Sequence, residues 1–122
     1  MAAARRAGAD AADALHVESA ALSVAERLGQ REKLEREESQ DLGLRVFIGR
    51  RQAVASTTDF GRAALDALVE RALAMARAVP EDPYCGLAEP AELARDYPDL
   101  DSTDPLEPSA ELLSERARAA ED

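Results

Sequence analysis

The sequence contains few of the residues that catalysis or covalent cross-linking requires. It has no tryptophan, one cysteine and one histidine among its 122 residues. A lone Cys85 cannot form an internal disulfide, and a lone His16 cannot supply a pair of histidine ligands. No run of 18 apolar residues is present, and the N-terminus has no apolar block of the kind found in signal peptides. These absences favour a cytoplasmic protein held together without disulfides.

Large aromatic side chains are also scarce, since the chain has two phenylalanines and two tyrosines. Hydrophobic residues nevertheless make up 46% of the sequence, and 27 positions are alanine. The core is therefore expected to consist of leucine, valine and closely packed alanine. A mass of 13.1 kDa fits one domain and leaves no room for a second, catalytic one.

Positive charge is in short supply, and its distribution divides the chain. The formal net charge is −10, which argues against binding to nucleic acid or to an anionic membrane. Residues 1–79 hold 12 basic and 12 acidic side chains, whereas residues 80–122 hold 3 and 13 and all six prolines. We therefore expect an α+β core at 1–79, a Pro-rich acidic arm at 80–108 and the start of a helix at 109–122.

The arm has two interpretations from composition. It is either a solvated linker with a few docked anchors, or a segment that packs back on the core. The apolar side chains available for packing are irregularly spaced: Tyr84, Leu87, Leu93, Tyr97 and Leu100.

Hydrophobic patterning predicts an antiparallel meander of about four strands after an N-terminal helix. Residues 2–14 are rich in alanine and favour the helix. Alternating apolar residues predict strands at 15–28, 42–48 and 52–57, with turns at Gly29-Gln30 and Gly49-Arg50. The charged stretch 31–39 fits either an exposed edge strand or a short helix.

A helix packed on the sheet is predicted next, ending before Pro80. Thr58 or Asp59 is expected to cap its N-terminus through a side-chain oxygen. Its buried stripe repeats at helical spacing and comprises Leu65, Leu68, Val69, Ala72, Ala76 and Val79. A last helix is expected from about Ser109 to Ala120, and because no C-cap glycine follows it, we expect the chain to be part of a longer protein.

Each side chain that could serve catalysis or ligand binding can also be explained by a structural role. His16 lacks a partner for catalysis, and the acidic surroundings of Cys85 disfavour a reactive thiolate. Asp96, Asp99, Asp101 and Asp104 resemble a cation cluster but lack the glycine and glutamate of a calcium loop. The polar residues 56–59 join a strand to a helix and are expected to cap that helix. We predict no catalytic, metal-binding or cofactor-binding residue, and the glycines form no phosphate-binding loop.

Several blocks of the sequence, in the same order, resemble the TldD/PmbA family in its PmbA (TldE) branch. Residues 42–59, LGLRVFIGRRQAVASTTD, are similar to the family string LGITVYVGQRKGSASTSDL. Residues 7–13 resemble AGADAAEV, residues 22–30 resemble LSVSVRLGEVE, and residues 81–88 resemble EDPYAGLAD. The resemblance extends over nearly the whole chain, from Ala7 to about Glu115.

This resemblance implies a non-catalytic N-terminal domain. In the family, TldD-like and TldE-like subunits form a heterodimeric cytoplasmic metalloprotease, also called a modulator of DNA gyrase, that trims unfolded or leader peptides. Its zinc ligands belong to a His-Glu-x-x-x-His motif of the TldD-type subunit, which PmbA-type subunits lack. The resemblance therefore implies a scaffold that helps to wall the chamber, with zinc only in the partner subunit.

An alternative interpretation is a stand-alone protein-interaction module that keeps the same fold. This module would cap or compete with a full-length partner. The partners expected of the subunit are a TldD-like subunit and peptide substrates. Uncovered apolar surface and free strand edges also predict weak homodimerisation, with the net negative charge maintaining solubility.

Overall fold

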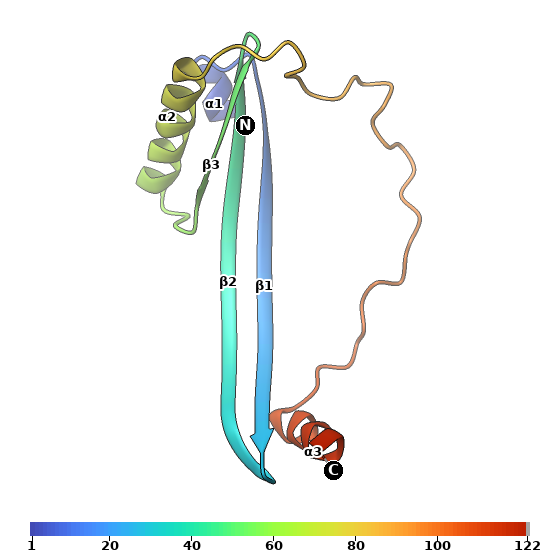
Figure 1. The fold of residues 1–122 in the computed structure, drawn as a ribbon. Coiled ribbons are helices and arrows are strands. Elements are labelled where there is room, and N and C mark those ends of the chain that lie inside the picture. The colour runs from blue at the N-terminus through green and yellow to red at the C-terminus, as the bar shows by residue number, and fades with distance from the viewer. Residues whose placement is uncertain (122) are drawn as a thin grey trace. The chain divides into compact units, whose positions relative to one another are not determined.

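A computed structural model describes residues 1–121 as an α+β protein (Figure 1). Within these residues the elements are α1 (Ala2–Arg6), β1 (Ala11–Arg27), β2 (Gln30–Ile48), β3 (Arg51–Thr57), α2 (Arg62–Ala78) and α3 (Ala110–Glu121). The strands form an antiparallel sheet in the order β1-β2-β3. The predicted α+β class, with an N-terminal helix, a helix after the sheet and a C-terminal helix, is confirmed.

The described part of the chain has three strands where the sequence predicted about four. The segments 31–39 and 42–48 belong to one strand, β2, so the short-helix alternative for 31–39 is wrong. Alternating charged residues are tolerated in a strand exposed to water, and Gln40-Asp41 does not interrupt it. Pairing with β1 thus prevails over the weak helix propensity of this stretch.

The N-terminal helix is shorter than predicted. It ends at Arg6, and β1 begins at Ala11, so the expected helix over 2–14 is wrong in its second half. Gly8 has a φ of +108°, a conformation that breaks the helix and that other residues rarely adopt. The amide of Asp10 then donates to the carbonyl of Phe47 in β2 at 2.9 Å, just before β1 begins.

Contacts divide the chain into two compact units. Unit 1 comprises Met1–Glu18 and Gln40–Leu93; unit 2 comprises Ser19–Ser39 and the chain from Ala94 onward. Strands β1 and β2 contribute residues to both units. The segments 1–79, 80–108 and 109–122 were predicted from charge and proline content and not from contacts. This division of the chain stays a prediction.

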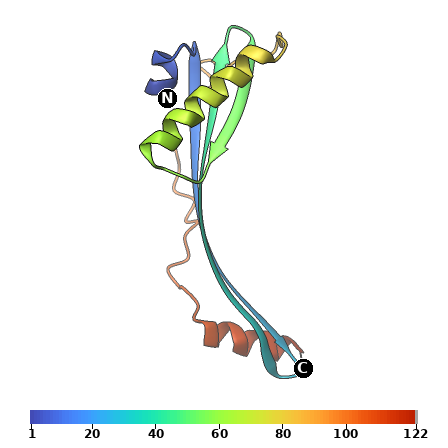
Figure 2. The same cartoon turned by 90° about the vertical axis from the view of Figure 1, so that its left-hand side faces the viewer.

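The core of unit 1 lies between α2 and one face of the sheet (Figure 2). Helix α2 buries Leu68, Ala72, Leu73 and Ala76, and the predicted stripe is confirmed at three of these positions. Across from them the sheet contributes small and branched side chains: Ala12, Leu44, Val46, Ala53 and Ala55. Alanine on both sides of this interface lets the helix approach the sheet closely, in keeping with the scarcity of aromatic residues.

The helix cap predicted at Thr58 or Asp59 is not formed. In the described chain the N-cap of α2 is Gly61, which has no side chain to accept a bond from the first turn. Asp59 instead accepts the amide of Gly61 through Oδ1 at 2.8 Å, which closes a local turn ahead of the helix. A side-chain cap is present at α3, where the hydroxyl of Ser109 accepts the amide of Leu112 at 3.2 Å.

The acidic arm contains neither helix nor strand over the described residues 79–109. In unit 1 it is fastened where the amide of Asp82 donates to the carbonyl of Arg50 at 2.8 Å, and Arg50 donates to the carbonyl of Pro83 at 3.1 Å. Within unit 1 the side chain of Tyr84 is 94% exposed and does not pack on the core, and in unit 2 the side chain of Tyr97 is 79% exposed. Whether the arm packs back on the core as a whole stays a prediction. No helix among residues 1–121 has the length and apolar character needed to span a membrane.

Candidate functional site

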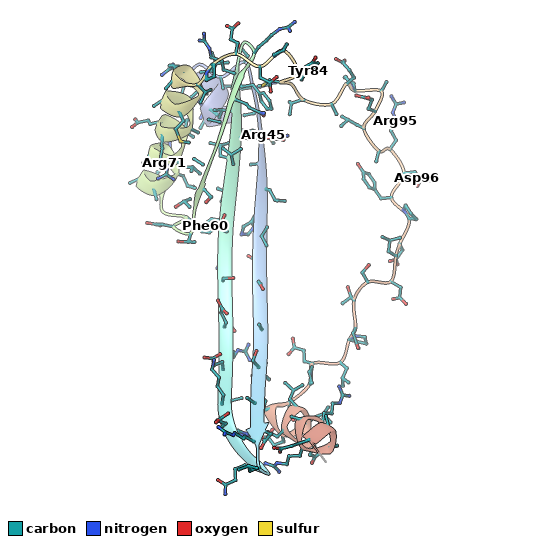
Figure 3. The ribbon with its side chains drawn as sticks, viewed as in Figure 1. Arg45, Phe60, Arg71, Tyr84, Arg95 and Asp96 are labelled. Carbon is teal, nitrogen blue, oxygen red and sulfur yellow. The ribbon has the colours of Figure 1, made fainter. Side chains whose placement is uncertain are left out.

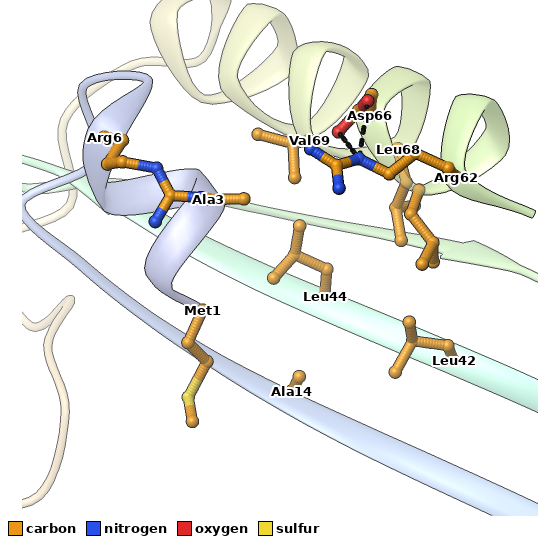
Figure 4. A pocket seen from close by; sticks show the side chains of 11 residues that line it. Met1, Ala3, Arg6, Ala14, Leu42, Leu44, Arg62, Asp66, Leu68 and Val69 are labelled. Carbon is orange, nitrogen blue, oxygen red and sulfur yellow. Dashed lines mark hydrogen bonds and ion pairs between the residues drawn. The ribbon is translucent and has the colours of Figure 1, made fainter. Parts of the chain in front are cut away.

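An apolar pocket of about 340 Å³ lies in unit 1 between the N-terminal helix, the sheet and α2 (Figure 4). Leu42 and Leu44 of β2 form its floor, and Leu68 and Val69 of α2 face them. The pocket exists because α1 ends after a single turn and a half and leaves the first turns of α2 uncovered. The complete lining is Met1, Ala3, Arg6, Ala14, Leu42, Leu44, Arg62, Leu65, Asp66, Leu68 and Val69.

Two guanidinium groups stand among the apolar residues of this pocket. Arg62 pairs with Asp66 one turn further along α2, with 3.1 Å between Nε and Oδ2 (Figure 4). Arg6 reaches the pocket from α1. The arrangement can accommodate an apolar side chain, but it presents no acid and base pair with which to carry out a reaction.

The opposite face of the sheet carries an ion pair between Asp13 and Arg45. Because side chains alternate along a strand, Arg45 and Phe47 lie on the face away from Val46. Arg45 Nε donates to Asp13 Oδ1 at 2.9 Å, and its guanidinium stacks 5.2 Å from the ring centre of Phe47. The hydrogen bond from Arg45 lowers the pKa of Asp13 below its usual value. This pair joins β1 to β2 and is structural.

The environment of His16 does not fit a zinc site. Its ring meets Phe60 edge to face, with 5.1 Å between ring centres, and Nε2 lies 3.7 Å from Oε1 of Glu18. Within residues 1–121 no group of three or more histidine, cysteine, aspartate or glutamate side chains is placed to hold a metal ion. The zinc implied by the family resemblance therefore finds no ligand set among the described residues.

The other sequence candidates make local contacts within their own units. Cys85 is a free, half-buried thiol. In the arm, the carboxylates of Asp99 and Asp104 accept the amides of Asp101 and Leu106, each two residues further on.

The polar segment 56–59 is likewise occupied by structural contacts. Arg71 of α2 donates to the carbonyl of Ser56 at 2.6 Å and ties the helix to the edge of β3 (Figure 3). The hydroxyl of Thr57 accepts the amide of Asp59 at 3.1 Å. The segment turns the chain from β3 into α2 and is not built to hold a ligand.

A polar cluster around a buried carboxylate and a buried hydroxyl in unit 2 was missed by sequence reasoning. It consists of Glu26 at the end of β1, Arg31 at the start of β2, and Ser114 and Arg118 on α3. The side chain of Glu26 is 1% exposed and Ser114 is 2% exposed. Arg118 Nε lies 3.2 Å from Glu26 Oε2, and Arg31 Nε donates to the hydroxyl of Ser114 at 2.9 Å.

Opposing effects act on the carboxylate of that cluster. Burial raises the pKa of Glu26, but the hydrogen bonds from Ser114 and Arg118 and the nearby charge of Arg31 outweigh it. The pKa of Glu26 therefore lies below its usual value, and the group is ionised at neutral pH. The available signal in the sequence was the spacing of Ser114, Arg118 and Glu121, which places them on one helix face.

Comparison with known proteins assigns the chain to a family. Residues 12–76 match the model described as "PmbA/TldA metallopeptidase domain 1". This range takes in almost all of the three strands and most of α2, and so covers most of the core of unit 1. The chain belongs to the PmbA/TldD family. The resemblance seen in the sequence blocks is thereby confirmed.

Two curated relatives support this assignment. The "Metalloprotease PmbA" of Escherichia coli O157:H7 is 36% identical over 112 residues, which are 92% of this chain and 25% of that protein. The "Metalloprotease PmbA homolog" of Haemophilus influenzae is 35% identical over 118 residues, which are 97% of this chain and 26% of that protein. The chain thus spans about a quarter of the length of these relatives.

Proposed function

We propose that this chain is the first domain of a PmbA/TldE-like subunit and acts as a scaffold in a cytoplasmic metalloprotease of the TldD/TldE type. In this role it would form part of the wall of a chamber in which unfolded or leader peptides are cut. The observation that carries the proposal is the match of residues 12–76 to the first domain of the family, on the elements that fold into the sheet and α2.

The environment of His16 supports a non-catalytic role. Metal-dependent hydrolysis needs about three protein ligands, an open position for water and a nearby base. His16 has an aromatic ring on one side and a single glutamate on the other. We therefore assign the zinc chemistry to a TldD-type partner and derive no catalytic step for this chain.

The surfaces of unit 1 suit a structural partner. The pocket beside α2 offers apolar walls with Arg6 and Arg62 among them, which can receive an apolar side chain flanked by acidic groups. In the three-stranded order the outer strands β1 and β3 each have one neighbour. Such edges can pair with a further strand of a neighbouring chain.

Two measurements test this proposal together. The chain is incubated with casein and zinc, and it is also mixed with a purified TldD-type subunit and run on a size-exclusion column. We expect no cleavage by the chain alone and co-elution with the subunit. Zinc-dependent cleavage that survives repurification and is lost in His16→Ala would contradict the scaffold role. Failure to co-elute would favour the stand-alone interaction module.

A further inference from the structure

The turn between β1 and β2 and its flanking residues, 26–31, are here called the hairpin end. We propose that the hairpin end is a recognition site for a helix that presents a hydroxyl, a guanidinium and a carboxylate on one face. Helix α3 occupies the site within its own chain, and the α3 of a second copy can occupy it in exchange. This inference is independent of the scaffold role, because all its contacts lie within unit 2.

The carboxylate is bound by two consecutive backbone amides. Leu28 N donates to Glu121 Oε1 at 2.6 Å, and Gly29 N donates to Oε2 of the same group at 3.1 Å. Leu28 and Gly29 both have positive φ, +51° and +71°, which a type I′ hairpin turn requires at its two central residues. Successive amides in such a turn point to one side and form a concave anion site. The turn therefore holds the carboxylate with donors fixed by the backbone.

The guanidinium and the hydroxyl are recognised next to this turn. Both Nε and Nη2 of Arg118 reach the carboxylate of Glu26, at 3.2 and 3.4 Å. Arg31 lies 3.8 Å from the same carboxylate and donates to the hydroxyl of Ser114. The side chains of Glu26 and Ser114 are almost completely buried, whereas those of Arg31 and Arg118 are 34% and 48% exposed. Removal of a partner would leave a buried polar group unpaired, which is costly.

The helix side of the contact is defined by spacing. Ser114, Arg118 and Glu121 stand at positions i, i+4 and i+7, which lie on one face of an α-helix. Glu115 and Arg116 have the same chemical groups, but they follow Ser114 by one and two positions and so lie about 100° and 200° around the helix from it. Recognition thus depends on the face that carries the groups and not on the charge of the helix as a whole. It also makes Glu115 and Arg116 matched controls.

The attachment of α3 allows exchange between copies. Residues 79–109, all of them described, form no helix or strand, so α3 is joined to α2 by a long tether. Six prolines stiffen this tether, but a linker of roughly 30 residues still holds its end near its own chain, at an effective concentration of up to about the millimolar range. The helix of the same chain therefore prevails in dilute solution. Exchange becomes measurable when the contacts of the resident helix are weakened.

The experiment uses the full-length chain and a synthetic peptide with the sequence of residues 109–122. The amide resonances of Leu28 and Gly29 are first compared in Glu121→Gln and Glu115→Gln. Peptide is then titrated into the wild-type chain and into the double variant Arg118→Gln/Glu121→Gln. Peptides with Glu121→Gln or Glu115→Gln serve as the matched ligands.

The expected result is a large shift of both amide resonances in Glu121→Gln and a small one in Glu115→Gln. Peptide should bind the double variant at least about tenfold more tightly than the wild-type chain, since the resident helix competes less. The Glu121→Gln peptide should lose this binding, and the Glu115→Gln peptide should keep it. Equal shifts in the two single variants would overturn the carboxylate site. Absence of peptide binding to the double variant would overturn exchange between copies.

Discussion

The two compact units of this chain are held together by different forces. In unit 1, α2 covers the sheet through leucine, valine and alanine, and the buried residues are apolar. In unit 2, α3 meets the hairpin end through a buried carboxylate, two guanidinium groups and a hydroxyl, and Ser114 is its fully buried residue. Apolar burial is insensitive to pH, whereas a network of charges depends on the ionisation of each member. The two helices should therefore respond to different perturbations.

The largest effect is expected from Leu68→Asp in α2. Leu68 is 2% exposed, so the variant places an unpaired charge in the core of unit 1. The cost is about 3–5 kcal/mol, against a total stability of roughly 5–15 kcal/mol for a domain. We expect loss of the cooperative melting transition measured by circular dichroism. Glu92→Ala, on the exposed arm, is the control and should melt like the wild type. An unchanged transition in Leu68→Asp would mean that this helix face does not support the core.

The next largest effect is expected from Glu26→Gln, which removes the charge that Arg31 and Arg118 share. Helix α3 is 12 residues long, a length at which an isolated helix is marginal in water. We expect α3 to lose its helical chemical shifts while α2 keeps them. Glu32→Gln is the matched control, because Glu32 forms an exposed pair with Arg27. If the two variants behave alike, the buried charge does not hold α3.

A smaller effect, graded with pH, follows from the lowered pKa of Glu26. A glutamate whose folded pKa is depressed stabilises the docked state above its unfolded pKa, about 4.3, and that contribution is lost as the pH falls through the lower folded value. We expect α3 to remain docked at neutral pH and to be released in acid, followed by the chemical shifts of Leu28 and Gly29. In Glu26→Gln, where α3 is expected to be released already at neutral pH, these chemical shifts should show no further release in acid. A wild-type chain in which acid does not weaken the docking of α3 at any pH would contradict the role of this carboxylate.

The smallest effects are expected from the exposed ion pairs of unit 1. Asp13→Asn breaks the pair with Arg45, whose side chains are each 40% exposed, and should cost up to about 1 kcal/mol in chemical denaturation. Asp66→Asn breaks a more exposed pair within α2 and should cost about 0.3–0.5 kcal/mol. A larger loss of unfolding free energy in Asp66→Asn than in Asp13→Asn would reverse this ranking.

Much of unit 1 could be predicted from the sequence, because its signals are periodic. The alternation over 42–48 and 52–57 and the helical stripe around Leu68 both reflect burial of one face. The sequence-based predictions failed where no buried face imposes a periodic pattern of apolar residues. Charged residues 31–39 have no hidden face, and the alanines of 2–14 favour a helix that Gly8 interrupts. At the start of α2, capping preference was outweighed by a turn that Asp59 makes with Gly61.

The polar cluster of unit 2 could not be predicted because its members are far apart in the sequence. Glu26 and Arg118 are separated by 92 residues, and nothing local marks either as buried. A charged residue in a charged stretch is ordinarily solvated, so composition indicated a surface. Only the pairing of β1 with β2 brings Glu26 and Arg31 together at the hairpin end. The helix spacing of Ser114, Arg118 and Glu121 was visible, but its partner was not.

The most direct test of this contrast is residue-resolved hydrogen exchange on two variants, Leu68→Ala and Glu26→Gln. Leu68→Ala shortens a buried side chain and Glu26→Gln neutralises one, and neither adds a charge. The account predicts that Leu68→Ala lowers protection in α2 and leaves α3 near its wild-type level, whereas Glu26→Gln lowers protection in α3 and leaves α2 unchanged. Equal loss of protection in both helices for each variant would contradict it, because the two helices would then depend on one shared source of stability.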